Sequence, residues 1–98
     1  MSGAPRPDLA VYVISVAARS LGTHPQTLRS YERLGFLTPA RSAGGVRLYS
    51  DEDLRVLTRI IELSAEGVSL AGIRRIIELE NRVAALESEL AEFRAIRP

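Results

Sequence analysis

The sequence contains no cysteine, no lysine and no tryptophan, and its only histidine is His24. The absence of cysteine excludes a disulfide framework, a thiolate metal site and a cysteine nucleophile. A single imidazole also excludes metal sites that need several histidine ligands. The carboxylates lie mainly on the polar faces of expected helices, and no nucleophile is paired with a base. We therefore expect no metal, no other cofactor and no enzymatic activity.

Long apolar runs are also missing from this chain of 98 residues. No segment approaches the ~18 consecutive apolar residues of a membrane span, and the first residues do not resemble a signal peptide. The expected location is therefore the cytoplasm. A chain of this length forms one small domain with a modest core, and pairing with a second copy is a common way to enlarge such a core.

The charges are unevenly distributed, although the formal net charge is only +1. Residues 9–49 contain five arginines and one acidic residue, whereas residues 78–92 contain five glutamates and one arginine. This polarity indicates an anionic partner for one end of the molecule. The alternative is a general bias of composition toward arginine.

Two short helices joined by a glycine turn are expected near the N-terminus. The first has Ser15 as its N-cap and ends at Gly22. The second has Thr23 as its N-cap, forms a capping box with Gln26, and runs to Leu34. This order is the helix-turn-helix signature. The side chains expected to face the core are Val16, Ala17, Leu21, Leu28 and Leu34.

The next segment, TPARSAGGVRLYS, predicts a small β-hairpin, or wing. Gly44 and Gly45 can supply the positive φ angles of a tight turn. Arg41 and Arg47 then lie on opposite arms. Tyr49 follows Arg47 by two residues, so both side chains point to the same face of the strand.

Two further helices complete the expected secondary structure. Ser50 caps the first, which has acidic residues at its positive end and ends at Gly67. Ser69 caps the second, which runs to about Ile96. From residue 76 its apolar side chains follow the a and d positions of a heptad repeat. These are Ile76, Leu79, Val83, Leu86, Leu90 and Phe93.

An apolar stripe of this length predicts a coiled-coil homodimer, because a lone helix would leave the stripe in water. The flanking charges do not fix the direction of pairing. Arg82 can meet Glu87 in a parallel pair or Glu89 in an antiparallel pair. The alternative is that the stripe folds back onto its own domain.

The outward face of the second short helix suggests contact with DNA. The early residues of the second helix in a helix-turn-helix reach base edges. Arginine can recognise guanine there, and glutamine can recognise adenine. Arginines and hydroxyls around them bind phosphates. An isolated exposed arginine is more often only solvated, but the adjacent wing adds further basic residues. The candidate DNA-binding residues are Ser15, Arg19, His24, Gln26, Thr27, Arg29, Ser30, Tyr31, Arg33, Arg41, Arg47 and Tyr49.

The order of these motifs resembles the DNA-binding domain of MerR-type transcription regulators over roughly residues 11–77. The family pattern T-[IL]-R-x-[YF]-[ED]-x-x-G-[LF]-[LIV]-x-P-x-R is followed by a glycine-containing wing that ends R-x-Y, and later by G-[VFI]-S-L-x-x-I. The matching residues are Thr27, Leu28, Arg29, Tyr31, Glu32, Gly35, Phe36, Leu37, Pro39, Arg41, Gly45, Arg47, Tyr49, Gly67, Val68, Ser69, Leu70 and Ile73. Ser30 and Val46 depart from it, where many relatives have aromatic residues.

Within that family, HPQTLRSYERLG, AGGVRLYS and SLAGIRRIIELENRVAALE resemble the HspR heat-shock repressors in particular. This resemblance implies a dimeric repressor of chaperone genes that binds an inverted-repeat operator in the bacterial nucleoid, with the DnaK chaperone as co-repressor. The alternatives are a regulator of another stress regulon, and a protein-interaction adaptor that does not bind DNA. No small-molecule effector site is evident.

The expected fold is mainly α. It comprises a flexible leader (1–10), a winged helix-turn-helix DNA-binding domain with a small β-hairpin wing (11–75), and a C-terminal coiled-coil dimerisation helix with its tail (76–98).

Overall fold

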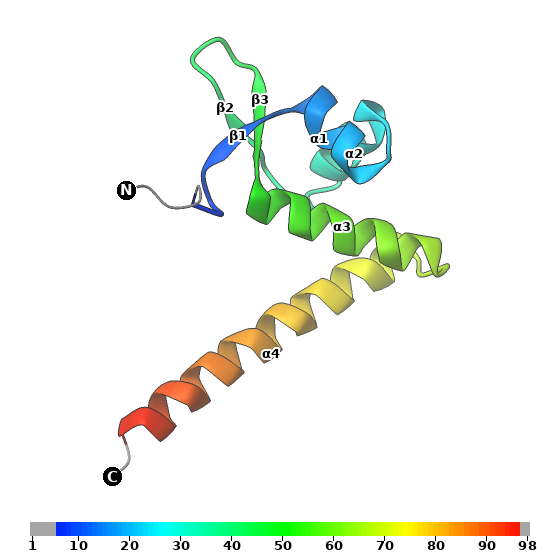
Figure 1. Ribbon diagram of the computed structural model, residues 1–98. Coiled ribbons are helices and arrows are strands. Elements are labelled where there is room, and N and C mark those ends of the chain that lie inside the picture. The colour runs from blue at the N-terminus through cyan, green and yellow to red at the C-terminus, as the bar shows by residue number, and fades with distance from the viewer. Residues whose placement is uncertain (1–5, 97–98) are drawn as a thin grey trace. The chain divides into compact units, whose positions relative to one another are not determined.

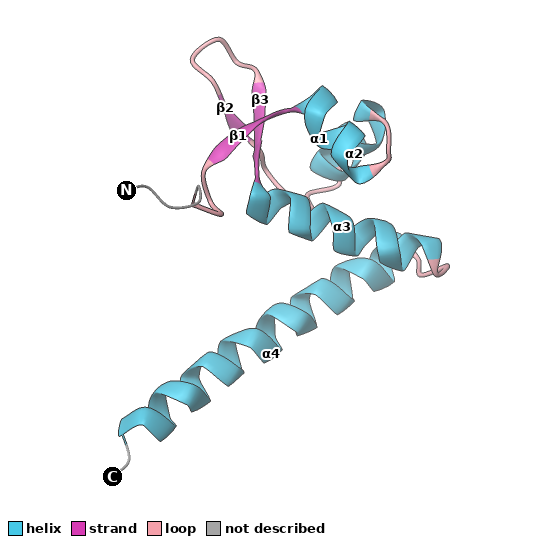
Figure 2. Cartoon of the chain, viewed as in Figure 1, coloured by secondary structure: helices cyan, strands magenta, loops and turns pink. Residues whose placement is uncertain are grey.

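The computed structural model describes residues 6–96, so the first five leader residues and the last two tail residues lie outside the described range. Its contacts divide the chain into two compact units between Glu62 and Leu63. Figures 1 and 2 show the elements in chain order. They are β1 (Ala10–Val13), α1 (Ile14–Leu21), α2 (Pro25–Arg33), β2 (Ala40–Arg41), β3 (Arg47–Ser50), α3 (Asp51–Ala65) and α4 (Leu70–Ile96).

Helices α1 and α2 form the expected helix-turn-helix around a left-handed glycine. Gly22 has φ 68° and ends α1, and the Thr23 amide donates to the Ala18 carbonyl at 3.0 Å. A side chain in this conformation is strained, so glycine is the natural residue here. Ala17 and Ala18 are buried on α1, and their small side chains let α2 pack closely. Leu28 is buried on α2.

The N-caps predicted for these two helices are wrong. Ser15 lies inside α1, whose N-cap position is Val13, and Thr23 precedes the N-cap of α2, which is His24. Neither cap makes a side-chain hydrogen bond, so the capping box with Gln26 does not form. The His24 carbonyl instead accepts the first amide of the helix ladder, from Thr27 at 2.9 Å.

Two of the five predicted core positions are also wrong. Val16 and Leu34 have 47% and 43% of their surface exposed, whereas Ala17 and Leu28 are buried and Leu21 is half-buried. Val16 lies about 100° around α1 from the buried Ala17, and Leu34 occupies the C-cap position after α2 ends at Arg33.

A three-stranded antiparallel sheet of order β1-β3-β2 carries the wing. Arg41 pairs with Arg47 across the hairpin, and Tyr12 pairs with Tyr49 between β1 and β3. The turn is wider than the predicted two-residue turn. Only Gly45 has positive φ, at 84°, and Ser42 closes the loop by donating its amide to the Val46 carbonyl at 2.9 Å.

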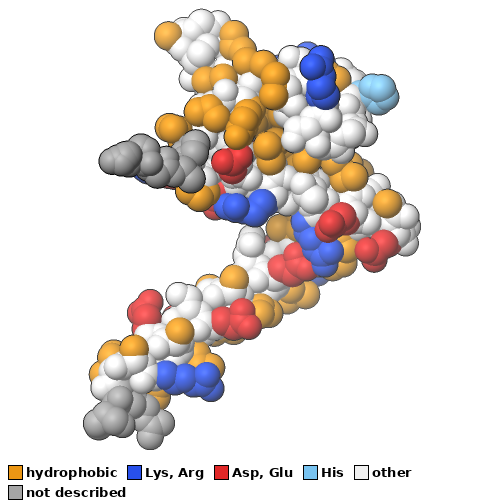
Figure 3. Space-filling view, viewed as in Figure 1, with side chains coloured by type: hydrophobic (Ala, Val, Ile, Leu, Met, Phe, Trp, Pro, Cys, Tyr) orange, Lys and Arg blue, Asp and Glu red, His pale blue; other side chains and the backbone are white. Residues whose placement is uncertain are grey.

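The outer face of this sheet carries exposed apolar side chains. Val11 and Val13 of β1 are exposed, as is Val46 beside β3. Figure 3 shows hydrophobic side chains gathered over the sheet and the wing. The opposite face lies toward the helices and contributes Tyr49 to the core.

Helix α3 begins with the capping box that α2 lacks. The Asp53 amide donates to Ser50 Oγ at 3.0 Å, and the Ser50 amide donates to Asp53 Oδ2 at 3.0 Å. This reciprocal pair satisfies two amides at the helix start. The cap predicted at Ser50 is confirmed. Leu57 and Ile60, one turn apart on α3, are completely buried.

The second unit consists of the end of α3 and the long helix α4. Gly67, with φ 88°, ends the turn after α3, and the Gly72 amide donates to Ser69 Oγ at 3.1 Å. The predicted glycine stop and serine cap are therefore confirmed. Along α4 the apolar stripe is exposed to solvent. Leu79, Val83, Leu86, Leu90 and Phe93 are 46–58% exposed.

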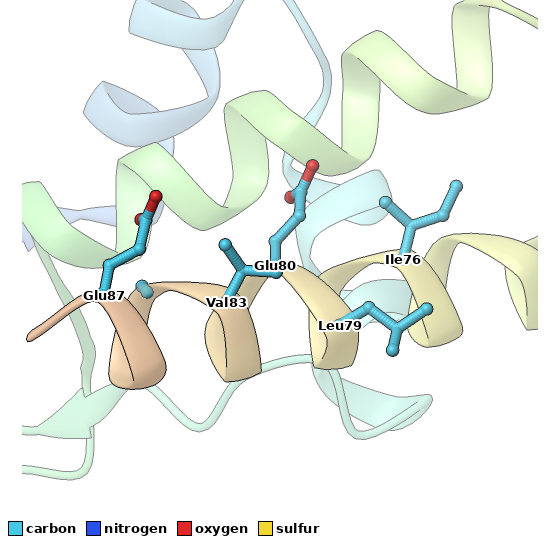
Figure 4. Close-up of a pocket in the computed structure, with 6 residues that line it drawn as sticks. Ile76, Leu79, Glu80, Val83 and Glu87 are labelled. Atoms are coloured by element: carbon cyan, nitrogen blue, oxygen red, sulfur yellow. The ribbon is translucent and has the colours of Figure 1, made fainter. Parts of the chain in front are cut away.

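The first part of this stripe forms a shallow hollow on α4. Ile76, Leu79 and Val83 line it, with Glu80 and Glu87 beside them (Figure 4). Among the described residues, no helix is long and apolar enough to cross a membrane.

Candidate nucleic-acid interface

The candidate site is the outward face of α2, a short helix held by its buried side chains. Leu28 and Tyr31 anchor α2 in the core. Gln26 and Arg33 are exposed, and they lie on the side of the helix away from these anchors. Thr27, Arg29 and Ser30 are half-buried, so each keeps part of its surface accessible. The five residues predicted on this face are therefore all available to a partner.

Ser30 organises part of this face. Its hydroxyl donates to the Gln26 carbonyl at 3.0 Å and accepts from Arg33 Nη2 at 3.1 Å. The Arg33 guanidinium is thus held along the helix surface instead of projecting freely. At this position the chain uses a hydroxyl to position a neighbouring cation.

The wing is attached to α2 through one carboxylate, that of Glu32. Arg41 Nη2 donates to Glu32 Oε2 at 3.1 Å, and Arg47 Nε donates to Glu32 Oε1 at 2.5 Å. Arg41 also donates to the Gly45 carbonyl at 3.1 Å, which stiffens the loop. The hydrogen bond from Arg47, reinforced by the charge of Arg41, lowers the pKa of the Glu32 carboxyl. The Arg47 pKa is raised by the same contact.

Sequence reasoning gave Glu32 no role, although the residue belongs to the matched motif. Its two contacts join positions nine and fifteen residues apart. A single acidic residue within a basic segment was the only available signal. Arg41 and Arg47 were predicted as DNA contacts, and the structure shows that both first serve to fix the wing against α2.

Tyr31 and Tyr49 lie in the core, not on the surface. Tyr31 is 9% exposed and its ring meets that of Phe36 edge-on, with centroids 6.0 Å apart. Tyr49 has no exposed surface. A fully buried side chain cannot reach a phosphate, so the prediction that Tyr49 contacts DNA directly is wrong for this conformation. Strand alternation correctly places it on the face of Arg47, but that face is the inner one.

The Tyr49 hydroxyl has no hydrogen-bond partner among the described residues. Burial raises its pKa, so the hydroxyl keeps its proton. An unpaired buried hydroxyl costs about 1–3 kcal/mol. Tyr49→Phe is therefore expected to leave the free energy of unfolding unchanged or to raise it, which urea denaturation measures. A loss of more than about 1 kcal/mol would show that the hydroxyl bonds within the folded protein.

The remaining predicted residues flank this face. Ser15 and Arg19 are exposed on α1, and His24 is exposed at the start of α2. None of these three side chains has a contact to Glu32 or the wing arginines within the described structure. They extend the basic and polar surface around α2.

Comparisons with known proteins agree with this arrangement. The family model described as MerR HTH family regulatory protein matches residues 12–80. A putative heat shock protein HspR of Streptomyces coelicolor is 56% identical over 89 residues, which are 90% of this chain and 59% of that protein. The HTH-type transcriptional repressor CarH of Myxococcus xanthus is 36% identical over 81 residues, 82% of this chain and 26% of that protein. The chain thus spans only part of these curated relatives.

Two MerR family regulators are among the solved structures that share the fold. One is HiNmlR, a MerR family regulator lacking the sensor domain, bound to promoter DNA. It superposes with a TM-score of 0.65 at 28% identity, covering 86% of this chain and 76% of that one. The other is a MerR family transcriptional regulator from Bacillus cereus. Its TM-score is 0.65 at 34% identity, covering 90% of this chain and 72% of that one.

Proposed function

The chain belongs to the MerR HTH family of regulatory proteins, and from this premise we propose that it is a dimeric repressor that binds an inverted-repeat operator. The observation that carries the proposal is the exposed polar face of α2. Gln26, Thr27 and Arg29 keep accessible surface on a helix fixed by buried neighbours. Side chains of these types recognise base edges in a major groove.

Two copies of α2 are needed to read an inverted repeat. The exposed stripe of α4 supports pairing with a second copy, because burying apolar side chains removes them from water. A two-fold protein then matches a two-fold operator, with the half-site spacing set by the dimer. The domain boundary expected between residues 75 and 76 remains part of this proposal, since it marks where the heptad pattern begins.

The regulated genes are proposed to be heat-shock and chaperone genes. The support is the 56% identity to a protein described as a putative heat shock protein HspR. The resemblance to HspR also brings the DnaK chaperone into the proposal as co-repressor, and it places the protein in the bacterial cytoplasm, on the nucleoid when bound. Mapping bound genomic sites with and without heat stress tests this assignment. Enrichment away from chaperone promoters would favour a regulator of another stress regulon.

Arg29→Ala is expected to weaken operator binding without unfolding the protein. Loss of one bidentate base contact costs about 1–3 kcal/mol per half-site. The measurement is a gel-shift titration at fixed salt, with the duplex that the wild-type chain enriches from a randomised pool. Arg55→Ala is the matched control, because Arg55 is an exposed arginine of α3 outside the proposed face. Equal affinity of wild type and Arg29→Ala would remove Arg29 from the interface.

A protein-interaction adaptor on the same fold is the competing function. Salt dependence separates the two, because binding that neutralises phosphates weakens steeply as salt is added. A wild-type chain that enriches no duplex, and whose DNA binding is insensitive to salt, would favour the adaptor.

A further inference from the structure

The wing places two arginines directly opposite each other. Arg41 and Arg47 are cross-strand partners in β2 and β3. Like charges at such positions repel and destabilise the pair. Glu32 removes this conflict by accepting from each arginine with a different carboxylate oxygen. The hairpin and α2 are therefore joined by a three-residue bridge that we call the Glu32 bridge.

The Glu32 bridge also changes how these arginines can act on DNA. The side chains of Glu32 and Arg47 are 20% and 29% exposed, so their interaction is partly shielded from solvent. Arg41 is more open, at 46%, but a second bond to the Gly45 carbonyl restricts it. Both guanidiniums are thus directed toward Glu32 and partly neutralised. By contrast, the part of the chain that the structure describes gives no carboxylate partner to Arg19, Arg29 or Arg33.

We propose that Glu32 is a specificity-determining positioning residue, which holds the wing at a fixed place beside α2 and withholds two arginines from indiscriminate phosphate binding. This inference rests on the proposed DNA-binding function. With the wing fixed, the protein can contact the bases read by α2 and the flanking DNA backbone at the same time. Withheld arginines reduce the electrostatic attraction that acts on any DNA sequence.

The test compares Glu32→Gln with wild type on two duplexes of equal length. One is enriched by the wild-type chain from a randomised pool, and the other is a scrambled version of it. Glutamine keeps the shape of glutamate but not its charge, so both arginines are released. Affinity for the enriched duplex is expected to fall roughly tenfold, because the coupled contacts are lost. Affinity for the scrambled duplex is expected to rise.

The salt dependence supplies a second readout. Each additional phosphate neutralised steepens the logarithmic salt slope by about 0.9. Glu32→Gln is expected to steepen the slope on the scrambled duplex by about 1 to 2 per protomer. In the double variant Glu32→Gln, Arg41→Gln, the salt slope should steepen less than in Glu32→Gln alone, because one of the two released arginines is then missing. Arg41→Gln alone keeps the Arg47–Glu32 contact and should give no gain on the scrambled duplex.

Glu52→Gln is the control for net charge. Glu52 is an exposed carboxylate of α3 in the same compact unit and makes no ion pair with an arginine in the described structure. It should leave both affinities unchanged. Circular dichroism melting of each variant reports whether the fold is retained.

Four outcomes are separable. Opposite changes on the two duplexes support the role of Glu32. A parallel loss on both duplexes means that Glu32 is only structural, and a parallel gain means that it only repels DNA; either result overturns the inference. If the wild type itself binds both duplexes equally, the proposed function fails instead.

Discussion

Val83→Glu is expected to make the chain monomeric and to weaken operator binding at least about a hundredfold, or ~2.7 kcal/mol. Val83 lies in the middle of the apolar stripe of α4 and is 53% exposed in the single chain. Pairing with a second copy would bury this position. A carboxylate there would have to be desolvated without a partner, which costs several kcal/mol per ion. Operator affinity falls when the dimer is lost, because the α2 helix of a monomer reads only one half-site.

Sedimentation velocity measures the assembly, and the gel-shift titration measures DNA binding. Asn81→Glu is the matched control, since Asn81 is exposed on the same helix but outside the stripe. It adds the same charge and should leave the dimer intact. If Val83→Glu stays dimeric, the second copy binds elsewhere and the stripe has another occupant.

Leu57→Ala is expected to lower the free energy of unfolding by about 2–5 kcal/mol. Leu57 is completely buried on α3, together with Ile60 one turn later. Truncation removes apolar contacts and leaves a cavity that a close-packed core fills only partly. In a domain this small, such a loss is a large share of the total stability. DNA binding should weaken indirectly, as the folded fraction falls.

Urea denaturation followed by circular dichroism provides the measurement. Thr58→Ala serves as the control on the neighbouring residue. The Thr58 hydroxyl is exposed and donates to the Leu54 carbonyl of its own helix. Its removal should change stability by less than about 0.5 kcal/mol. A similarly small effect for Leu57→Ala would mean that this part of the core rearranges to fill the space.

Features set by local backbone chemistry could be predicted from the sequence. Gly22 and Gly67 end helical segments because their positive φ angles exclude most side chains. The Ser50 cap was predictable because a serine there precedes acidic residues and an amphipathic pattern. The wing followed from the glycine pair and the strand pattern around it. In each case the signal lies within a few residues of its effect.

Features that depend on distant contacts could not be predicted. The Glu32 bridge spans two loops, and spacing alone does not bring its members together. The alternation of side chains along a strand predicted that Tyr49 shares a face with Arg47. It did not predict which face of the sheet is buried. The caps of α1 and α2 could not be predicted for the same reason. Several adjacent residues could serve as cap, and the backbone angles that select one come from the packing of the sheet and helices.

The Glu32 bridge also constrains how this protein can evolve. One carboxylate serves two guanidiniums, so the three positions do not vary independently. Substituting Arg41 or Arg47 first leaves part of the carboxylate charge uncompensated, and substituting Glu32 first leaves two opposed cations. Effects at contacting positions are not additive, so the order of substitutions matters. A lineage that replaces this bridge therefore has few acceptable mutational paths, and the three residues are expected to be inherited as one unit.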